Sequence, residues 1–309
     1  MNRTVRWYLA GLSLALLTCV VPSLERGFTI TLKPALVQLA LASMLALIAW
    51  VYARIRHAPS IAVAAETAFW ATVISTAFTF PMHLLIRSGV PLSDAVLARA
   101  DRLLGLNVWR LSGWAQAHGL SAALGTIYFS LRPVSIAALL LPGFARRAEW
   151  ASELLLAMAI SAAASLLILS QVQAIGPWVG GHFAPDATQA ACESSIRALK
   201  AGSPVVINLA EVAPLIAFPS WHVILALLSA RTIARVRLLR WPAIVWATLL
   251  VISTVGTRWH YAVDSLAGVV LALLSLLASS RLHQVWRPRR CPESVELTDS
   301  GSKQLPTIA

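Results

Sequence analysis

FPSWH, residues Phe218–His222, stands at the entrance of an apolar run that continues to about residue 236. A second histidine, His260, stands at the entrance of another apolar run, inside GTRWHYAVD (Gly256–Asp264). Ionisable groups are rare in membrane spans, and those that occur are usually functional. The two stretches therefore predict membrane helices whose ends carry chemically active side chains.

The composition predicts an all-α integral membrane protein of about eight spans. The chain has 309 residues, of which 58% are hydrophobic and 12% charged, whereas soluble domains carry about 25% charged residues. A span needs about 20 mostly apolar residues. Eight runs approach this length, at 7–24, 35–53, 61–85, 118–142, 151–172, 219–236, 241–257 and 261–280.

The net charge of +12 is arranged for a membrane rather than for nucleic acid. Arginines cluster at alternate connections between the predicted spans, as the positive-inside rule requires. The pattern predicts a multi-pass protein of the inner (plasma) membrane with both termini in the cytoplasm, so that both histidines face the periplasm or exterior. The charge pattern gives no information on the oligomeric state. The clusters are Arg3 and Arg6; Arg54 and Arg56; Arg146 and Arg147; Arg231 to Arg240; and Arg281 to Arg290.

Three parts are expected along the chain. Residues 1–60 form an N-terminal pair of spans with few polar side chains, and residues 61–282 form a six-span bundle. Residues 283–309, with Pro, Ser and Gly, form a disordered cytoplasmic tail. The three cysteines are scattered and lack metal-ligand spacing, so neither a metal site nor a disulfide is expected.

Two long outer segments, 88–118 and 173–217, lie in the bundle region. In the first, Ser93–Gly105 has apolar residues at helical spacing with charges on the other face, which predicts a helix lying on the membrane surface. In the second, a helix is expected from Gln189 to Lys200. Loops of this length often act as lids or substrate platforms.

Pro219 suits the first turn of a helix, where its missing N–H costs nothing. The free amides near Ser220, Trp221 and His222 would then face the outer surface. Such a helix end binds anions, phosphate above all. His222 can also donate a proton to a phosphate ester.

His260 and Asp264 are four residues apart and share a face if both lie on one helix. A carboxylate against one ring nitrogen fixes the tautomer and makes the other nitrogen more basic. The pair therefore predicts an oriented, nucleophilic imidazole. Arg258 cannot share that face on a regular helix, but it reaches a phosphate if the helix starts near Trp259.

A third polar element is YFSLRP, residues Tyr128–Pro133. Arg132 in an apolar run is costly unless it meets an anion, and its guanidinium matches phosphate in a bidentate manner. The alternative is a snorkelling arginine. Tyr128 and Ser130 are candidate substrate contacts, with helix–helix contact as the alternative.

These residues resemble the type 2 phosphatidic acid phosphatase superfamily, whose motifs are Lys-x6-Arg-Pro, Pro-Ser-x-His and Ser-Arg-x5-His-x3-Asp. The second motif matches at Pro219–His222, and the core of the third matches at His260 and Asp264. The first matches only at Arg132-Pro133, because Gly125 holds the lysine position. Thr254 holds the arginine position of the third motif.

The resemblance implies a six-span helical bundle and a metal-free, cofactor-free reaction. His260 would be the nucleophile that forms a phosphohistidine, Asp264 would orient it, and His222 would protonate the leaving alcohol. Further roles follow by position: phosphate binding by Ser220, Arg132 and Arg258, and possible substrate binding by Tyr128, Ser130, Trp221 and Tyr261.

Within the superfamily, the sequence resembles bacterial relatives of inositol phosphorylceramide synthase. Tyr128-x-Ser130, the acidic segment Asp94–Gly105 and FPSWH carry this likeness. It implies a phosphotransferase that moves a phosphoryl or phospho-headgroup unit from a lipid phosphate or phospholipid to a lipid alcohol. Two alternatives stay open: a lipid phosphate phosphatase with water as acceptor, and a non-enzymatic transporter or scaffold.

Overall fold

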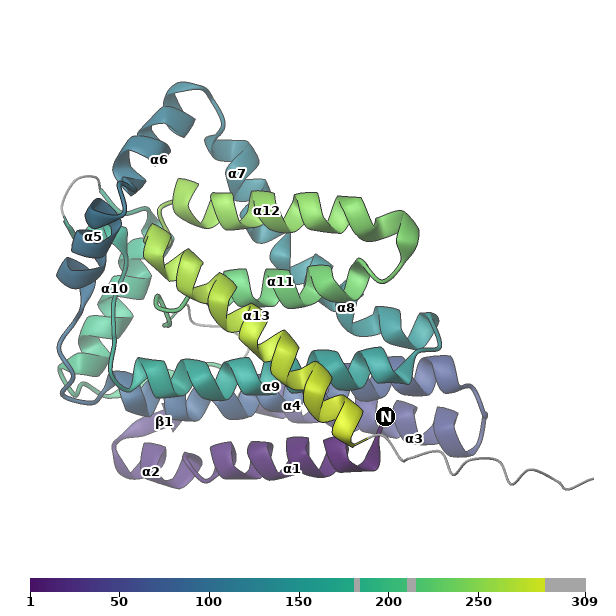
Figure 1. Ribbon diagram of the computed structural model, residues 1–309. Helices are drawn as coiled ribbons and strands as arrows, with labels where there is room; N and C mark the ends of the chain where they lie inside the picture. The colour runs from purple at the N-terminus through teal and green to yellow at the C-terminus, as the bar shows by residue number, and fades with distance from the viewer. Residues whose placement is uncertain (181–183, 210–214, 287–309) are drawn as a thin grey trace, which may run out of the picture.

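The computed structural model describes residues 1–180, 184–209 and 215–286, and in these the protein is helical apart from one pair of short strands (Figure 1). Seven helical stretches of the described chain are long and apolar enough to cross a membrane, and the shorter apolar helix Trp221–Ile233 is an eighth candidate. The all-α integral membrane fold is confirmed. The seven are Arg3–Glu25, Leu32–Arg54, Pro59–Ile86, Ser121–Phe144, Ala148–Leu169, Arg237–Gly256 and Ala262–Val285.

The elements follow one another along the chain as labelled in Figure 1. They are α1 (Arg3–Leu17), α2 (Val20–Glu25), β1 (Phe28–Ile30), α3 (Leu32–Arg54), α4 (Pro59–Ile86), α5 (Asp94–Leu103), α6 (Val108–Ala117), α7 (Ser121–Phe129), α8 (Leu131–Phe144), α9 (Ala148–Leu169), η1 (Pro177–Gly180), α10 (Ala187–Lys200), β2 (Val205–Ile207), α11 (Trp221–Ile233), η2 (Arg237–Leu239), α12 (Arg240–Gly256) and α13 (Ala262–Val285).

The core lies where α9 packs against α4, α11 and α13. Helix α9 is rich in alanine and leucine, and five consecutive residues, Leu155–Ala159, are buried. Small side chains let neighbouring membrane helices approach closely. Figure 1 shows α13 crossing this layer diagonally, from the end where α5 and α10 lie to the end where the chain begins.

The run expected at 118–142 is divided at Ser130 into α7 and α8. The Ser130 hydroxyl donates to the Ile127 carbonyl (2.6 Å) and accepts from Trp246 Nε1 of α12 (2.9 Å). Pro133 lies in the first turn of α8, where the missing N–H is tolerated. Ser130 therefore holds α7–α8 against α12, which is the helix–helix alternative for this residue.

The two outer segments are largely structured. They supply α5, α6, η1 and α10 at one end of the molecule, at the left of Figure 1. The helix expected from Gln189 is confirmed as α10, which begins at Ala187 behind a capping box from Asp186 and Gln189. Strand β2 pairs in parallel with β1, which an all-helical expectation did not include. The pairing ties the connection before α3 to the second outer segment.

The expectation that Ser93–Gly105 forms a surface helix with its charges turned outward is corrected by helix α5. The helix is present, but Asp94 and Asp101 are buried at 8% and 3% exposure, whereas Val96 and Leu103 are exposed. Ser93 makes no side-chain capping bond. The acidic face packs inward because its carboxylates have backbone amides to bind.

The tail expected at 283–309 lies mostly outside the described residues. Helix α13 continues to Val285, three residues beyond the expected end of the bundle region.

Candidate active site

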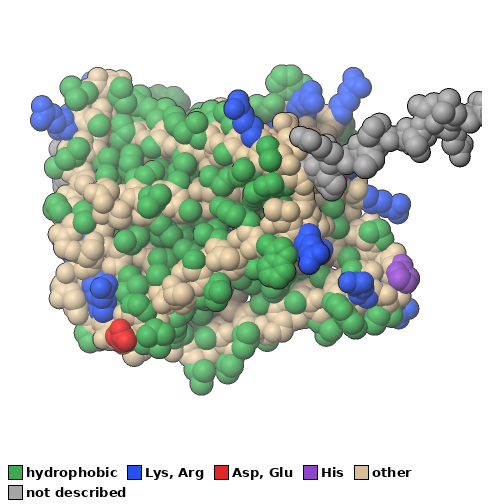
Figure 2. Space-filling view, turned by 60° about the horizontal axis from the view of Figure 1, so that its bottom comes forward, with side chains coloured by type: hydrophobic (Ala, Val, Ile, Leu, Met, Phe, Trp, Pro, Cys, Tyr) green, Lys and Arg blue, Asp and Glu red, His purple; other side chains and the backbone are tan. Residues whose placement is uncertain are grey.

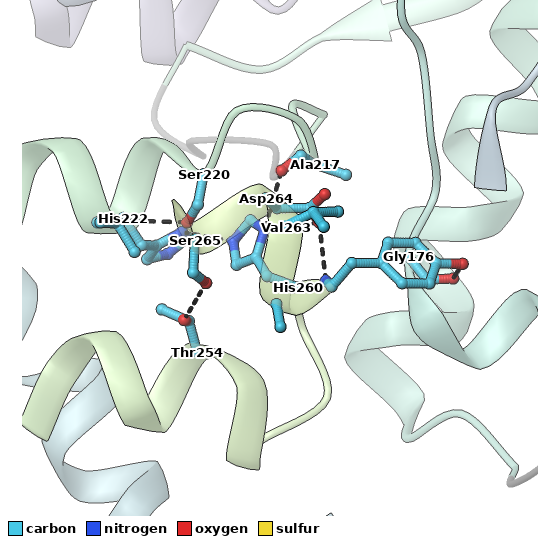
Figure 3. A network of polar contacts seen from close by, with 12 residues as sticks. Gly176, Ala217, Ser220, His222, Thr254, His260, Val263, Asp264 and Ser265 are labelled. Atoms are coloured by element: carbon cyan, nitrogen blue, oxygen red, sulfur yellow. Dashed lines mark hydrogen bonds and ion pairs between the residues drawn. The ribbon is translucent and has the colours of Figure 1, made fainter. Parts of the chain in front are cut away.

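The two histidines of the sequence motifs meet at one point of the fold (Figure 3). His222 is the second residue of α11, and His260 lies in the loop between α12 and α13. His260 Nε2 is 3.4 Å from His222 Nδ1, and the ring centroids are 5.6 Å apart at 60°. The convergence predicted from sequence therefore exists in the structure.

His260 is oriented by a carbonyl rather than by the expected carboxylate. Its Nδ1 lies 2.9 Å from the Ala217 carbonyl oxygen and 3.6 Å from Asp264 Oδ2. A carbonyl only accepts, so Nδ1 carries the proton and Nε2 presents its lone pair toward His222. His260 precedes the first residue of α13 by two positions, so the expected shared helix face with Asp264 is wrong.

Burial sets the protonation of His260. The side chain is 4% exposed, and desolvation lowers the pKa of His260 to about 4, although the bond to Ala217 acts in the opposite direction. The ring is therefore neutral at pH 7, which is the form that the predicted role requires.

Asp264 joins the starts of α11 and α13. Its Oδ2 accepts the Tyr261 backbone N–H at 2.8 Å, which closes the first turn of α13. Its backbone carbonyl accepts the N–H of Ser220 at 3.0 Å. Among the described residues, Oδ1 of this fully buried carboxylate has no hydrogen-bond partner. The Asp264 side chain thus lies 3.6 Å from His260 Nδ1 without a direct hydrogen bond to it.

The start of α11 offers fewer free amides than expected. The Ser220 N–H is bonded to Asp264, and the buried Ser220 hydroxyl accepts the Val223 N–H at 3.4 Å as the helix cap. Within the part of the chain that the structure describes, the backbone amides of Trp221 and His222 remain as first-turn donors without a bond. An anion at this helix end would meet two amides rather than three.

Tyr128 of α7 fixes the second histidine. Its ring stacks on His222 with centroids 4.5 Å apart at 25°, and its hydroxyl lies 3.3 Å from His222 Nδ1. The Trp259 ring is nearly parallel to the Tyr128 ring, with centroids 6.2 Å apart. Of the four candidate substrate residues, Tyr128 is the one that contacts a histidine of the pair.

The other candidate substrate residues point elsewhere. Ser130 bonds Trp246, as described. Trp221 stacks on Phe78 of α4 at 5.5 Å. Tyr261 directs its hydroxyl to Asp94 Oδ1 (3.3 Å) and the Gly176 carbonyl (3.2 Å).

The two candidate arginines lie on different segments of the fold. Arg132 is exposed on α8. Arg258 lies between α12 and α13 with φ +65°, so a helix does not start near Trp259 as supposed. Its backbone carbonyl accepts from Gln189 Nε2 of α10 at 3.4 Å. The loop conformation, rather than a helix face, decides where this guanidinium lies.

Sequence reasoning missed a pair of carboxylates on α5, here called the α5 clamp (Asp94 and Asp101). Asp101 accepts the Ala262 and Val263 N–H groups at 2.9 and 2.8 Å, at the start of α13. Asp94 accepts the Gly176 N–H at 2.9 Å and both its oxygens lie 3.1 Å from the Ile175 nitrogen. Burial raises the pKa of both carboxyls, and these amide bonds oppose the rise. Their spacing of seven residues, two helical turns, was the available signal.

The two residues at which the motifs depart from the family pattern, Gly125 and Thr254, are uncharged. Thr254 is fully buried, and its hydroxyl lies 2.8 Å from that of Ser265. Gly125 faces open space on α7, with no atom within 4 Å of an added Cβ. A neutral hydroxyl pair and a gap thus stand where the pattern has an arginine and a lysine.

A family model described as the PAP2 superfamily matches residues 95–278, more than half of the chain. The chain belongs to the PAP2 superfamily. Membership makes this PAP2 protein a membrane lipid phosphatase or phosphotransferase of the metal-independent type. The match spans both histidines, Asp264 and the α5 clamp residue Asp101. No curated protein and no solved structure gives a significant match.

Proposed function

We propose that the protein is a lipid phosphotransferase that works through a phosphohistidine on His260. The observation that supports this proposal best is the orientation of the His260 ring. Its Nδ1 is hydrogen-bonded to the Ala217 carbonyl oxygen, and its Nε2 faces His222. A neutral imidazole with one nitrogen held and the other directed at a proton donor is arranged for nucleophilic catalysis.

The reaction has two balanced halves. The Nε2 lone pair of His260 attacks phosphorus, the bond to the leaving oxygen breaks, and His222 gives that oxygen its proton. An acceptor alcohol then gives its proton to His222 and attacks phosphorus, which breaks the N–P bond. Asp264, 3.6 Å from His260 Nδ1, stabilises the positive charge that the ring carries between the two halves.

Substrate must separate the two rings. A reacting atom in a near-attack position lies about 3–3.5 Å from its nucleophile, and the gap between the two nitrogens is 3.4 Å in total. A phosphorus atom with its oxygens does not fit there. We infer that His222 moves on its Tyr128 stack when substrate binds, since catalytic contacts often tighten only in the complex.

Ser220, Arg258 and Arg132 are proposed to supply phosphate contacts, with Arg258 ahead because it is two residues from the nucleophile. Arg258→Ala should lower kcat/KM about 10- to 100-fold, the weight of a charge-assisted hydrogen bond or two. Arg258→Lys should recover part of the loss. Unchanged turnover in Arg258→Ala would remove this residue from the site.

The acceptor is proposed to be a lipid alcohol such as ceramide or diacylglycerol, which follows the likeness to the inositol phosphorylceramide synthase branch. The catalytic unit is proposed to be residues 61–282, with the site at the outer membrane face as the arginine pattern predicts. The second candidate is a phosphatase, in which water takes the place of the alcohol with the same histidine chemistry.

The test uses purified protein with a panel of lipid phosphates and phosphodiesters, ceramide and diacylglycerol as acceptors, and His260→Ala as control. Mass spectrometry follows the phosphorus. We expect a new phospholipid with wild type and none with His260→Ala. Free inorganic phosphate without a new lipid would establish the phosphatase instead. Equal product from His260→Ala would reject the phosphohistidine mechanism.

A further inference from the structure

A groove of about 650 Å³ lies between α1, α3 and α4, far from the two histidines. It is bordered by the first residues of α1, the last of α3 and the first three turns of α4. The histidine site lies toward the opposite end of α4, where Phe78 stacks on Trp221. The Asn2 side chain bonds the Trp286 carbonyl, just past the end of α13, whereas His260 lies just before its start.

Two chemically different sets of side chains line the groove, and each set includes residues of both α3 and α4; they are called the apolar wall and the polar wall below. One is built from small and aromatic side chains, including Ala46, Ala49, Trp50 and Trp70. The other carries Arg6, Glu66, Arg54 and His57. Figure 2 shows several Lys and Arg side chains and one His toward the right-hand end of this face, with other Lys and Arg side chains at its left edge. A ligand that fits both walls is an amphiphile.

The charge of the polar wall is positive. Glu66 is its one acidic residue, and both carboxylate oxygens are held by Arg6, at 2.5 and 2.8 Å. Arg54 is exposed at the last position of α3 and has no acidic partner among the described residues. With the Arg6–Glu66 pair neutralised, Arg54 leaves the wall with excess positive charge, and His57 beside it adds a polar ring.

The apolar surface of helix α3 is not covered by the rest of the described protein. None of its 23 residues is buried, and large apolar side chains along it, such as Leu36, Leu39 and Leu47, are more than half exposed. In a bilayer such a helix is covered by lipid. A groove that opens beside it is therefore filled from the lipid phase, and basic pockets between membrane helices suit anionic headgroups.

We propose that this groove binds one anionic phospholipid, with the headgroup phosphate on Arg54 and His57 and an acyl chain along the Ala46, Ala49 and Trp50 wall. The site is separate from the catalytic one and does not depend on the proposed reaction. The volume agrees with the roughly 300–1,000 Å³ of ordinary ligand sites.

Native mass spectrometry of the full-length protein tests the proposal, with phosphatidylglycerol and phosphatidylcholine as probes. We expect one phosphatidylglycerol to be retained in preference to phosphatidylcholine, and Arg54→Gln to weaken that retention about fivefold, the effect of one basic residue at a membrane surface. The matched control is Arg56→Gln, an exposed arginine two residues away that does not line the groove. It should bind as wild type does.

Two further variants locate the lipid. Trp50→Ala should weaken retention through the apolar wall, whereas His260→Ala should not change it. Equal retention of both lipids, or equal losses in Arg54→Gln and Arg56→Gln, would overturn the proposal in favour of general surface attraction. Competition by soluble glycerol phosphate would overturn it in favour of a water-soluble anion. Arg54 is exposed, so its replacement does not endanger folding.

Discussion

A backbone oxygen orients the His260 ring. A carbonyl at 2.9 Å fixes which nitrogen carries the proton, and the carboxylate of Asp264 stands farther back, at 3.6 Å. A carbonyl orients the ring without adding a full charge. The buried ring therefore keeps a pKa well below the ordinary 6.5, which a directly bonded carboxylate would have raised.

The pH profile should record this environment. The nucleophile must be neutral, and a group with a lowered pKa stays neutral until the pH falls to that value. We therefore expect the acid limb of kcat/KM to have its midpoint at about 4 rather than near 6.5. Phosphohistidine formation measured between pH 3.5 and 8 would show it. A midpoint at 6.5 would mean that the ring is solvated in the working enzyme.

At the scale of elements, the site lies where two helices begin beside each other and a third helix crosses the start of one of them. Helices α11 and α13 start beside each other, and α5 lies across the start of α13 with Asp101 on two of its amides. A carboxylate there satisfies orphan donors and complements the positive helix end. The α5 clamp thus sets where α13 begins, and with it the position of His260 two residues earlier.

Asp101→Asn should loosen this junction. An amide keeps an oxygen but loses the charge and presents N–H groups to other N–H groups, so we expect a loss of about 1–3 kcal/mol in the free energy of unfolding. A fall in kcat with little change in KM would indicate a misplaced nucleophile. Arg102→Gln, exposed on the same helix, is the control. Equal thermal stability and turnover for Asp101→Asn and wild type would contradict the clamp.

Gly268 allows α13 to cross the start of α11 closely. An added Cβ would lie 2.8 Å from the Ser220 carbonyl oxygen and 3.1 Å from Val223 Cβ, with backbone as one of the obstacles. Gly268→Ala should therefore push the two helices apart and reduce activity at least about tenfold, as 1 Å displacements in active sites do. Gly125→Ala meets nothing within 4 Å and should be neutral or slightly stabilising. Activity assays on the two variants would compare them directly.

For the whole molecule, the sequence predicted the spans and the meeting of the two histidines, because apolar runs and motif spacing are local signals. The sequence did not predict which side chains and backbone groups contact one another at the site. The Ala217 carbonyl, the Tyr128 stack and the inward face of α5 depend on how distant segments pack. Asp94 and Asp101 look like solvated charges in a linear pattern, and only the amides of residues 175, 176, 262 and 263 reveal their partners.

The same packing predicts that turnover survives chelation. Three buried carboxylates near the two histidines, Asp94, Asp101 and Asp264, each accept backbone N–H groups, and among the described residues no three His, Cys, Asp or Glu side chains are grouped to hold a metal ion. Phosphate release or transfer measured with excess EDTA should equal the untreated rate. A complete loss that magnesium restores would require a different chemistry.

Helix α11 is short, and its length has a kinetic consequence. Its 13 residues rise about 20 Å, against a hydrocarbon layer of about 30 Å, and its far end carries the arginines that mark one membrane face. If those arginines lie at the cytoplasmic face, as the charge pattern predicts, the end of α11 that carries His222 lies on the outer side of the membrane but within the lipid layer. Water would be dilute at that depth, whereas lipid hydroxyls would arrive with each diffusing lipid. A phosphorylated His260 formed there would be long-lived until a lipid collided with it. The choice between water and a lipid alcohol as acceptor would then follow from their local concentrations, before any recognition of the headgroup.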